Sequence, residues 1–244
     1  MRKDHSLKKV FISCHQGLGD HLLCNGIYRE YAKLYKKCVL PVETKYIDTI
    51  RYMLSDVNNI QIIPLPLRES WKYIRIWRLL YTLLGYRHLK LGSHGANFFL
   101  EGVRFDKNFY DQAKIPFTKR WSSFAFPRNY ASESSLFDSK NAQKGQYVFL
   151  HEDASRNFLI DRSLIQTDLP VITPSNLRQN INFFHYALLL ENAAEIHCIE
   201  SSFAAFVESM QVPVKKFAHR YARGHAAKDF RHEFTYLSDW IIYD

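Results

Sequence analysis

The sequence predicts a compact α/β protein built from two halves. Three observations lead to this expectation. Short apolar runs alternate with amphipathic stretches in the first part of the chain, and the same alternation begins again after a polar segment. A glycine turn, Ser13 to His21, joins the first apolar run to the first amphipathic stretch. Such a junction exposes backbone N–H groups and the positive end of a helix at the carboxyl edge of a sheet, where α/β proteins hold ligands.

The first half, residues 1–126, predicts a βαβαβ order followed by a basic helix. Leu23, Ile27, Tyr31 and Leu34 recur at helical spacing after the glycine turn. The expected elements are the strand Val10–Ser13, the helix Asp20–Tyr35, the strand Cys38–Val42, the helix Lys45–Leu54, the strand Ile60–Pro64, a helix in 68–90, strands near His88–Leu91 and Asn97–Leu100, and the helix Asp106–Lys114.

A polar segment, residues 127–146, predicts an inter-half linker, and residues 147–244 the second half. The second set of elements is the strand Tyr147–His151, the strand Pro170–Thr173, the helix Asn180–Asn192, the strand Glu195–Ile199, the helix Ser201–Met210, the strand Val214–Phe217, and a last strand or cover in Phe234–Asp244. Two βα halves in sequence imply two parallel sheets that face each other across a cleft.

Composition indicates a cytoplasmic, soluble chain. Hydrophobic residues make up 47% of the sequence, enough for real cores, yet no apolar run approaches the roughly twenty residues that span a bilayer. The N-terminus leads into polar sequence rather than a signal-peptide core. The cysteines lack CxxC spacing, so we expect reduced core thiols at Cys14, Cys24, Cys38 and Cys198.

The formal net charge of +9 fits nucleic acid, acidic lipid or a polyphosphate ligand equally well. Basic and aromatic residues are most concentrated in residues 68–90, where Trp71, Ile74, Trp77, Arg78 and Tyr81 share one helical stripe. This stripe suits an interfacial helix on anionic lipid, at the inner membrane face. The alternative, an ordinary helix that packs on the sheet with its basic face in water, is slightly favoured.

The glycine turn admits a dinucleotide interpretation, with Glu43 near the position of a ribose-binding acid. The bulky Leu22 at the third glycine position and the carboxylate of Asp20 oppose it. Asp20 is better explained as a helix N-cap or as a group that handles a hydroxyl, and the two are about equally expected. His15 points to the same cleft mouth, or is a hydrogen-bonded loop histidine.

A second polar cluster, His151 to Asn157, directly follows the strand that opens the second half. Arg156 is the strongest candidate there, because a guanidinium is a rigid bidentate fork for phosphate oxygens. Its alternative is a salt bridge to Glu152, Asp153 or Asp161.

A third cluster, Glu195 to Phe203, ends a buried strand and opens a helix with two serines. Ser201 and Ser202 with the free N–H groups of the helix start form an anion site, and Glu200 can accept hydrogen bonds from ribose or sugar hydroxyls. A plain Ser201 N-cap is the alternative. His197 alternates with apolar neighbours, so a satisfied, partly buried histidine is expected.

At these clusters the chain resembles a known family. The segment His15-Gln16-Gly17-Leu18-Gly19-Asp20 resembles the N-terminal glycine loop of nucleotide-sugar glycosyltransferases of the GT-B architecture, which has two facing Rossmann-like halves; the heptosyltransferase-like and fucosyltransferase-like enzymes belong to this group. Leu190 to Phe203 is similar to their donor-binding strand-to-helix turn, and His151 to Asn157 to the loop whose basic residue meets the donor diphosphate. The sequence has no HExxH, GxxxxGK[ST] or GxSxG motif.

The resemblance implies sugar transfer from a nucleotide diphosphate sugar to a glycan, glycolipid or other hydroxyl, as in polysaccharide biosynthesis, with no metal or other cofactor. The second half would hold the donor, with its diphosphate on Arg156, Ser201 and Ser202 and its ribose near Glu200; His151 and Asn157 would also contact the donor. The acceptor would approach the loop of Gln16, Gly17 and Gly19 in the first half, with Asp20 or His15 as general base. The type of sugar stays open.

Two other classes of function remain. One is a non-catalytic module that binds glycans or polyanions on the same fold, since fold alone does not establish chemistry. The other, less favoured, is an NAD-dependent oxidoreductase. Specific nucleic-acid binding is not expected, because no RNP-like or helix-turn-helix signature accompanies the charge.

Overall fold

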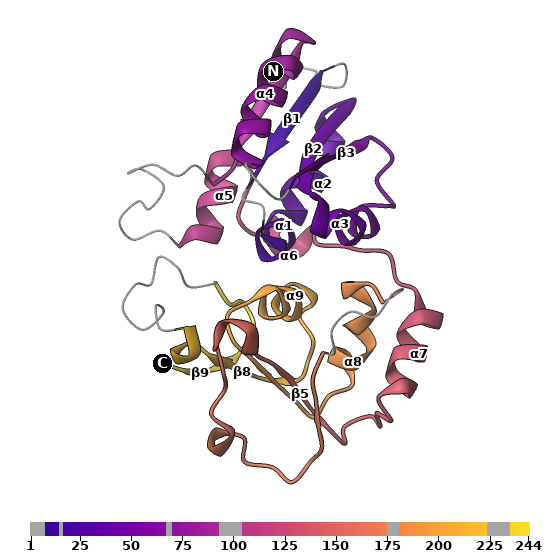
Figure 1. Cartoon of the computed structure of the whole chain (residues 1–244), viewed down its shortest axis with the longest axis vertical. Coiled ribbons are helices and arrows are strands. Elements are labelled where there is room, and N and C mark those ends of the chain that lie inside the picture. Colours follow the sequence, from indigo (N-terminus) through magenta and orange to yellow (C-terminus); the bar gives the residue numbers. More distant parts are fainter. Residues whose placement is uncertain (1–7, 15–16, 67–69, 93–103, 175–180, 224–234) are drawn as a thin grey trace. The chain divides into compact units, whose positions relative to one another are not determined.

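The chain folds into two units, which are described separately. The computed structural model describes residues 8–14, 17–66, 70–92, 104–174, 181–223 and 235–244, and the side chains of residues 70 and 71 lie outside the description. Unit 1 is Met1–Pro127 and unit 2 is Arg128–Asp244 (Figure 1). Each unit is a layered α/β fold with its own parallel sheet.

The described part of unit 1 contains a four-stranded sheet in the order β3-β2-β1-β4. All neighbouring strands are parallel, with β1 between β2 and β4. After their first residue, β1 and β2 are buried throughout, as expected for a parallel sheet covered on both faces. The strands are β1 (Lys9–Ser13), β2 (Lys37–Glu43), β3 (Ile60–Leu65) and β4 (Tyr86–Lys90).

The helices of unit 1 connect these strands and follow the last of them. They are α1 (Leu18–Leu23), α2 (Asn25–Leu34), the 3₁₀ turn η1 (Thr44–Tyr46), α3 (Ile47–Met53), α4 (Ser70–Leu83), α5 (Phe105–Ala113) and α6 (Lys119–Ser122). The single helix expected over Asp20–Tyr35 is two helices, because Cys24 ends α1 and caps α2 with ψ near zero.

The basic segment 68–90 is not one helix. Helix α4 ends at Leu83, Gly85 takes a left-handed φ of 80° in the turn that follows, and Tyr86–Lys90 returns as β4 beside β1. The strand expected near His88–Leu91 is therefore confirmed, with an earlier start. The strand expected at Asn97–Leu100 lies outside the described residues.

The described part of unit 2 contains a five-stranded parallel sheet in the order β6-β5-β7-β8-β9. Its strands are β5 (Val148–His151), β6 (Val171–Ile172), β7 (Glu195–Cys198), β8 (Lys215–His219) and β9 (Trp240–Tyr243). Its helical elements are α7 (Tyr130–Ser139), η2 (Ala154–Arg156), η3 (Arg162–Leu164), η4 (Phe183–Tyr186), α8 (Ala187–Glu191), α9 (Ser202–Met210) and η5 (Tyr221–Arg223). The last strand expected in Phe234–Asp244 is β9.

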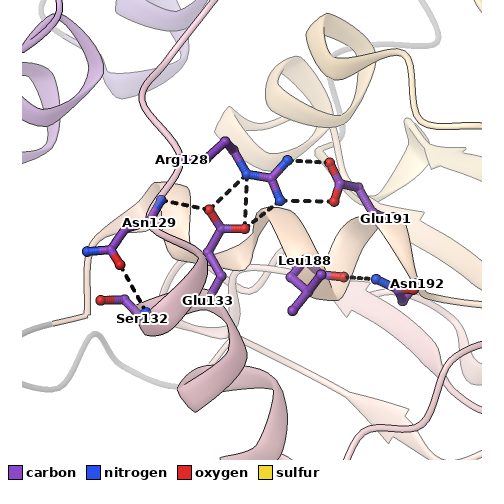
Figure 2. Close-up of polar contacts among 7 residues, drawn as sticks. All are labelled: Arg128, Asn129, Ser132, Glu133, Leu188, Glu191 and Asn192. Atoms are coloured by element: carbon purple, nitrogen blue, oxygen red, sulfur yellow. Dashed lines mark hydrogen bonds and ion pairs between the residues drawn. The ribbon is translucent and has the colours of Figure 1, made fainter.

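Residues 127–146, the expected linker, contain helix α7, which belongs to unit 2. Leu136 and Glu133 of α7 are buried. Figure 2 shows how Arg128 lies between two carboxylates and ties α7 to α8: it donates to both oxygens of Glu133 and to both oxygens of Glu191. A polar composition therefore conceals a folded helix held by charge pairing.

In both sheets the strand order reverses beside the first strand of the unit. In unit 1 the chain moves from β1 to β2 and β3 on one side and later to β4 on the other; in unit 2 it moves from β5 to β6 on one side and then to β7 on the other. The carboxyl edge at such a reversal is where doubly wound sheets bind ligands. In the part of the chain that the structure describes, no helix has the length and hydropathy needed to cross a membrane.

Candidate functional site

The carboxyl edge of unit 2 brings together two of the predicted residues. His151 ends β5, and Ser201 follows β7, the neighbouring strand at the reversal point. The Ser201 Oγ and His151 Nδ1 atoms are 3.0 Å apart and share a hydrogen bond, and the His151 ring packs on Phe203 at 4.6 Å between centroids. Burial lowers the pKa of His151 to about 4, so its ring is neutral at pH 7.

Ser201 occupies the N-cap position of α9, but its side chain makes no capping hydrogen bond. Its hydroxyl is instead engaged with His151. Ser202 begins the helix, and both serines are partly exposed. The helix start therefore keeps N–H groups that the serine does not cap, which suits an anion.

Glu200 is buried and already engaged. Its carboxylate accepts a hydrogen bond of 3.1 Å from the Tyr236 hydroxyl and lies 3.4 Å from Arg220 Nε. Arg223 donates to the Glu200 carbonyl oxygen. The ribose contact of Glu200 stays a prediction. For a ribose hydroxyl to bind there, Tyr236 or Arg220 must give up its contact with one oxygen of this carboxylate.

Arg156 is exposed and pairs with Asp153, at 2.6 Å between Nε and Oδ2. The salt bridge named as its alternative is thus present, and the phosphate contact stays a prediction. Its guanidinium lies 5.0 Å from the centre of the Phe158 ring, and the guanidinium of Arg223 lies 5.7 Å from the same ring. Asn157 is exposed and ends η2 in a left-handed conformation with φ 58°.

Sequence reasoning missed Arg220, Arg223 and Tyr236. Arg220 directly follows strand β8, and Arg223 lies in η5 just after it. The rule that singled out His151 to Asn157, polar residues after an apolar strand, could have found both. Tyr236 carries no such signal, because it meets Glu200 across 36 positions of the chain.

His197 is a satisfied buried histidine, as expected, and it belongs to a hydrogen-bonded chain. Its Nδ1 lies 3.0 Å from His219 Nε2 and its Nε2 lies 3.3 Å from a Glu195 oxygen. His219 Nδ1 in turn lies 3.2 Å from the Tyr221 hydroxyl, which accepts from the Asp161 N–H. This chain joins two strands and a loop, which is a structural role.

The carboxyl edge of unit 1 is formed around the glycine turn. Gly17 is the N-cap of α1, so the expectation that Asp20 caps the helix is wrong: Asp20 lies in the first turn. A Cβ added at Gly17 would lie 2.7 Å from Asp20 Oδ2, which shows that the carboxylate folds back over the glycine. Gly19 lies in the same turn of helix, while His15 and Gln16 lie outside the described residues.

Buried side chains beneath the glycine turn form hydrogen bonds that connect the end of β1 to its neighbours. The Tyr28 hydroxyl lies 3.0 Å from both Cys14 Sγ and His21 Nδ1, which links the end of β1 to both helices that follow. On the other side, Ser13 Oγ of β1 shares a 2.9 Å hydrogen bond with His88 Nε2 of β4. All four cysteines are buried thiols, in agreement with the expected core thiols.

Comparison with known proteins establishes the fold. No protein-family model matches the sequence, and no curated protein does either. A family 9 glycosyl transferase from Veillonella parvula DSM 2008 superposes with a TM-score of 0.63 at 9% identity, covering 98% of this chain and 86% of that one. The E. coli heptosyltransferase WaaC with ADP-2-deoxy-2-fluoro heptose gives 0.52 at 11% identity, covering 96% and 92%.

A third structure is the iron-containing dodecameric glycosyltransferase TibC from enterotoxigenic E. coli H10407, with a TM-score of 0.52 at 13% identity. The superposition covers 87% of this chain and 61% of the TibC chain. Together these similarities define a fold of the GT-B glycosyltransferase type, with the α/β units and parallel sheets that the sequence predicts. Among the described residues no group of three or more His, Cys, Asp or Glu side chains is placed to hold a metal ion.

Proposed function

We propose that this protein is a glycosyltransferase that moves a sugar from a nucleotide diphosphate sugar to a hydroxyl acceptor. One observation carries the proposal: on a fold shared with glycosyltransferases over nearly the whole chain, Asp20 in unit 1 and His151 and Ser201 in unit 2 follow the strands beside the reversal point of each sheet. Fold alone would not be enough, because one fold hosts many functions. The site residues add the chemistry.

The donor binds at the carboxyl edge of unit 2 in this proposal. The diphosphate lies on the start of α9, where Ser201 and Ser202 supply hydroxyls and the helix supplies N–H groups. Since His151 is neutral, positive charge must come from a guanidinium, and Arg156 is the proposed source. Protein groups then stabilise the leaving diphosphate without a metal ion.

The acceptor binds at the carboxyl edge of unit 1, and Asp20 or His15 removes its proton. Gly17 caps the helix and Gly19 lies in its first turn, and the Asp20 carboxylate stands over Gly17 at this helix start. A carboxylate there opposes a bound pyrophosphate but suits a hydroxyl. The acceptor is a glycan or a lipid-linked glycan, and the reaction takes place in the cytoplasm.

Two rival functions lead to different nucleotide specificities. A dinucleotide enzyme needs an open turn, whereas Leu22 is buried at the third position of the loop and Asp20 carries a charge there. A non-catalytic module keeps the fold and binds glycans or polyanions without a nucleotide. Both can be separated from a transferase by ligand binding.

A thermal-shift screen of ADP, UDP, GDP, CMP and NAD tests the proposal. The sugar in the WaaC structure is carried by ADP, so ADP is the first compound to try. A ligand at about a hundred times its Kd stabilises the folded state by about 2.7 kcal/mol. Stabilisation by one nucleoside diphosphate, followed by release of that nucleotide from its sugar donor, supports transfer. Stabilisation by NAD, or by none of the five, contradicts it.

A further inference from the structure

Helix α4 has two apolar faces. One packs on the sheet of unit 1: Ile74 and Tyr81 are buried, Trp77 is partly buried, and the Tyr81 ring lies 5.1 Å from that of Phe11. Of the residue stripe expected to contact lipid, Ile74, Trp77 and Tyr81 therefore pack on the core while Arg78 is exposed, and the side chain of Trp71 lies outside the description. The ordinary-helix alternative correctly predicts this packing, yet the outer face is not simply basic.

The outer face of α4 carries large apolar side chains that are exposed to solvent. Ile76, Leu79 and Leu83 are 63%, 65% and 77% exposed, and Leu80 lies among them at the same helical spacing. Within the described residues, six of the thirteen exposed large hydrophobic side chains fall between Tyr73 and Leu84. We call this set, Tyr73, Ile76, Leu79, Leu80, Leu83 and Leu84, the α4 apolar face. Clustering of this kind marks an interaction surface.

The charges beside this face have one sign. Positions 70–100 contain no Asp or Glu, while Lys72, Arg75 and Arg78 of α4 and Arg87 and Lys90 of β4 are all exposed. A second copy of the chain would present the same positive charges across a two-fold axis, and these would repel. The surface that complements exposed leucines with a basic border is apolar inside and anionic at its edge.

We propose that the α4 apolar face docks on an anionic lipid membrane surface. Leucine and isoleucine side chains enter the boundary between headgroups and acyl chains, and the arginines and lysines meet the lipid phosphates. Helix α4 has 14 residues, too short to cross a bilayer, so it lies along the surface. This inference is independent of sugar transfer, because none of the six residues of the α4 apolar face belongs to either carboxyl edge.

Vesicle co-sedimentation tests the proposal. The full chain is mixed with vesicles of an equal mixture of phosphatidylglycerol and phosphatidylcholine, or of phosphatidylcholine alone. We expect binding to the anionic vesicles to be stronger by at least tenfold, since each basic residue near such a surface contributes roughly fivefold. Salt at about 1 M, where the screening length is about 3 Å, should release most of the protein.

The decisive variant is Ile76→Ser with Leu83→Ser, which should weaken binding to anionic vesicles at least about tenfold. Both side chains are exposed, so the fold is kept, and the thermal midpoint verifies this. The matched control is Leu237→Ser in unit 2, a leucine 62% exposed that should bind vesicles like the wild type. Equal binding by the double variant and the wild type overturns the proposal, and so does a concentration-dependent dimer in light scattering that the double variant abolishes. A wild-type protein that binds the anionic vesicles but releases no nucleotide from a sugar donor would contradict the proposed function and leave this inference standing.

Discussion

Removing Arg128 should destabilise unit 2 more than removing the charges on both sides of its ion pair. Glu133 is fully buried, and Arg128 donates to it through Nε at 2.8 and 3.0 Å. The same guanidinium holds Glu191 at 2.6 and 3.0 Å (Figure 2). Hydrogen bonds from Arg128 to Glu133 and then Glu191 raise the pKa of the guanidinium, so Arg128 keeps its positive charge at any ordinary pH.

The expected magnitude follows from burial. In Arg128→Met the Glu133 carboxylate stays buried without the guanidinium and keeps the hydrogen bond of 3.1 Å from the Asn129 N–H. Leaving this charge buried without its ion-pair partner costs about 3 kcal/mol. Glu191→Gln keeps Arg128 paired with Glu133 and removes a carboxylate that is 33% exposed, so it costs below about 1 kcal/mol. Arg128→Met with Glu133→Leu removes both charges and loses mainly the Asn129 bond, about 1 kcal/mol.

Urea unfolding followed by circular dichroism measures these free energies. Lys107→Met is the control, because it removes an exposed ion pair with Asp111 in unit 1 and should change the free energy of unfolding by less than about 0.5 kcal/mol. The order of stability should be wild type, Glu191→Gln, the double variant, and Arg128→Met last. If the double variant is less stable than Arg128→Met alone, the buried charge is not what makes the single change costly, and the reasoning fails.

Three further predictions concern the site and pH. Arg156→Ala should weaken nucleoside diphosphate binding by about 2 kcal/mol or more, and Arg156→Lys should recover only part of this, in isothermal titration; equal affinities would restrict Arg156 to its pair with Asp153. Asp20→Asn should leave donor binding nearly unchanged and slow transfer roughly a hundredfold; slow transfer in His15→Gln alone would make the histidine the base. Burial lowers the pKa of His21 to about 3 and those of His88, His151 and His219 to about 4. The unfolded chain, with histidine pKa values of about 6.5, therefore binds more protons than the folded protein between pH about 4 and 6.5. As the pH is lowered through this range, the free energy of unfolding should fall by up to about 1.4 kcal/mol per pH unit for each histidine. Equal urea midpoints at about pH 7 and about pH 5 would refute this linkage.

The strands could be predicted because burial on both faces demands continuous apolar runs. Every residue of β2 after Lys37 is buried, and its sequence is correspondingly apolar up to the final Glu43. The polar residues that follow strands were predictable for the same reason, since their contrast with the run is sharp. His151 and Ser201 were found in this way, and strand order then brought them together.

Helix α7 could not be predicted, because its stability depends on partners that local sequence does not reveal. Its serines and acids resemble a linker, yet Glu133 is buried against Arg128, and Arg128 also reaches Glu191, 63 positions away. Glu200 is a similar case, since Tyr236 and Arg220 that engage it come from later segments. Helix α4 misled in another way: both of its faces are apolar, so its periodicity did not distinguish core from surface.

The neutral state of His151 fixes how the proposed donor site works. Because burial holds its pKa at about 4, the ring contributes hydrogen bonding and packing at pH 7 but no charge. Its bond to Ser201 occupies a hydroxyl that would otherwise cap α9, so the helix start remains open to a ligand. The positive charge at this edge then comes from the guanidinium groups of Arg156 and Arg223 beside Phe158. Acid therefore weakens the fold before it alters the charge of this edge, and a loss of nucleotide binding at pH about 5 would reflect unfolding rather than titration of the site.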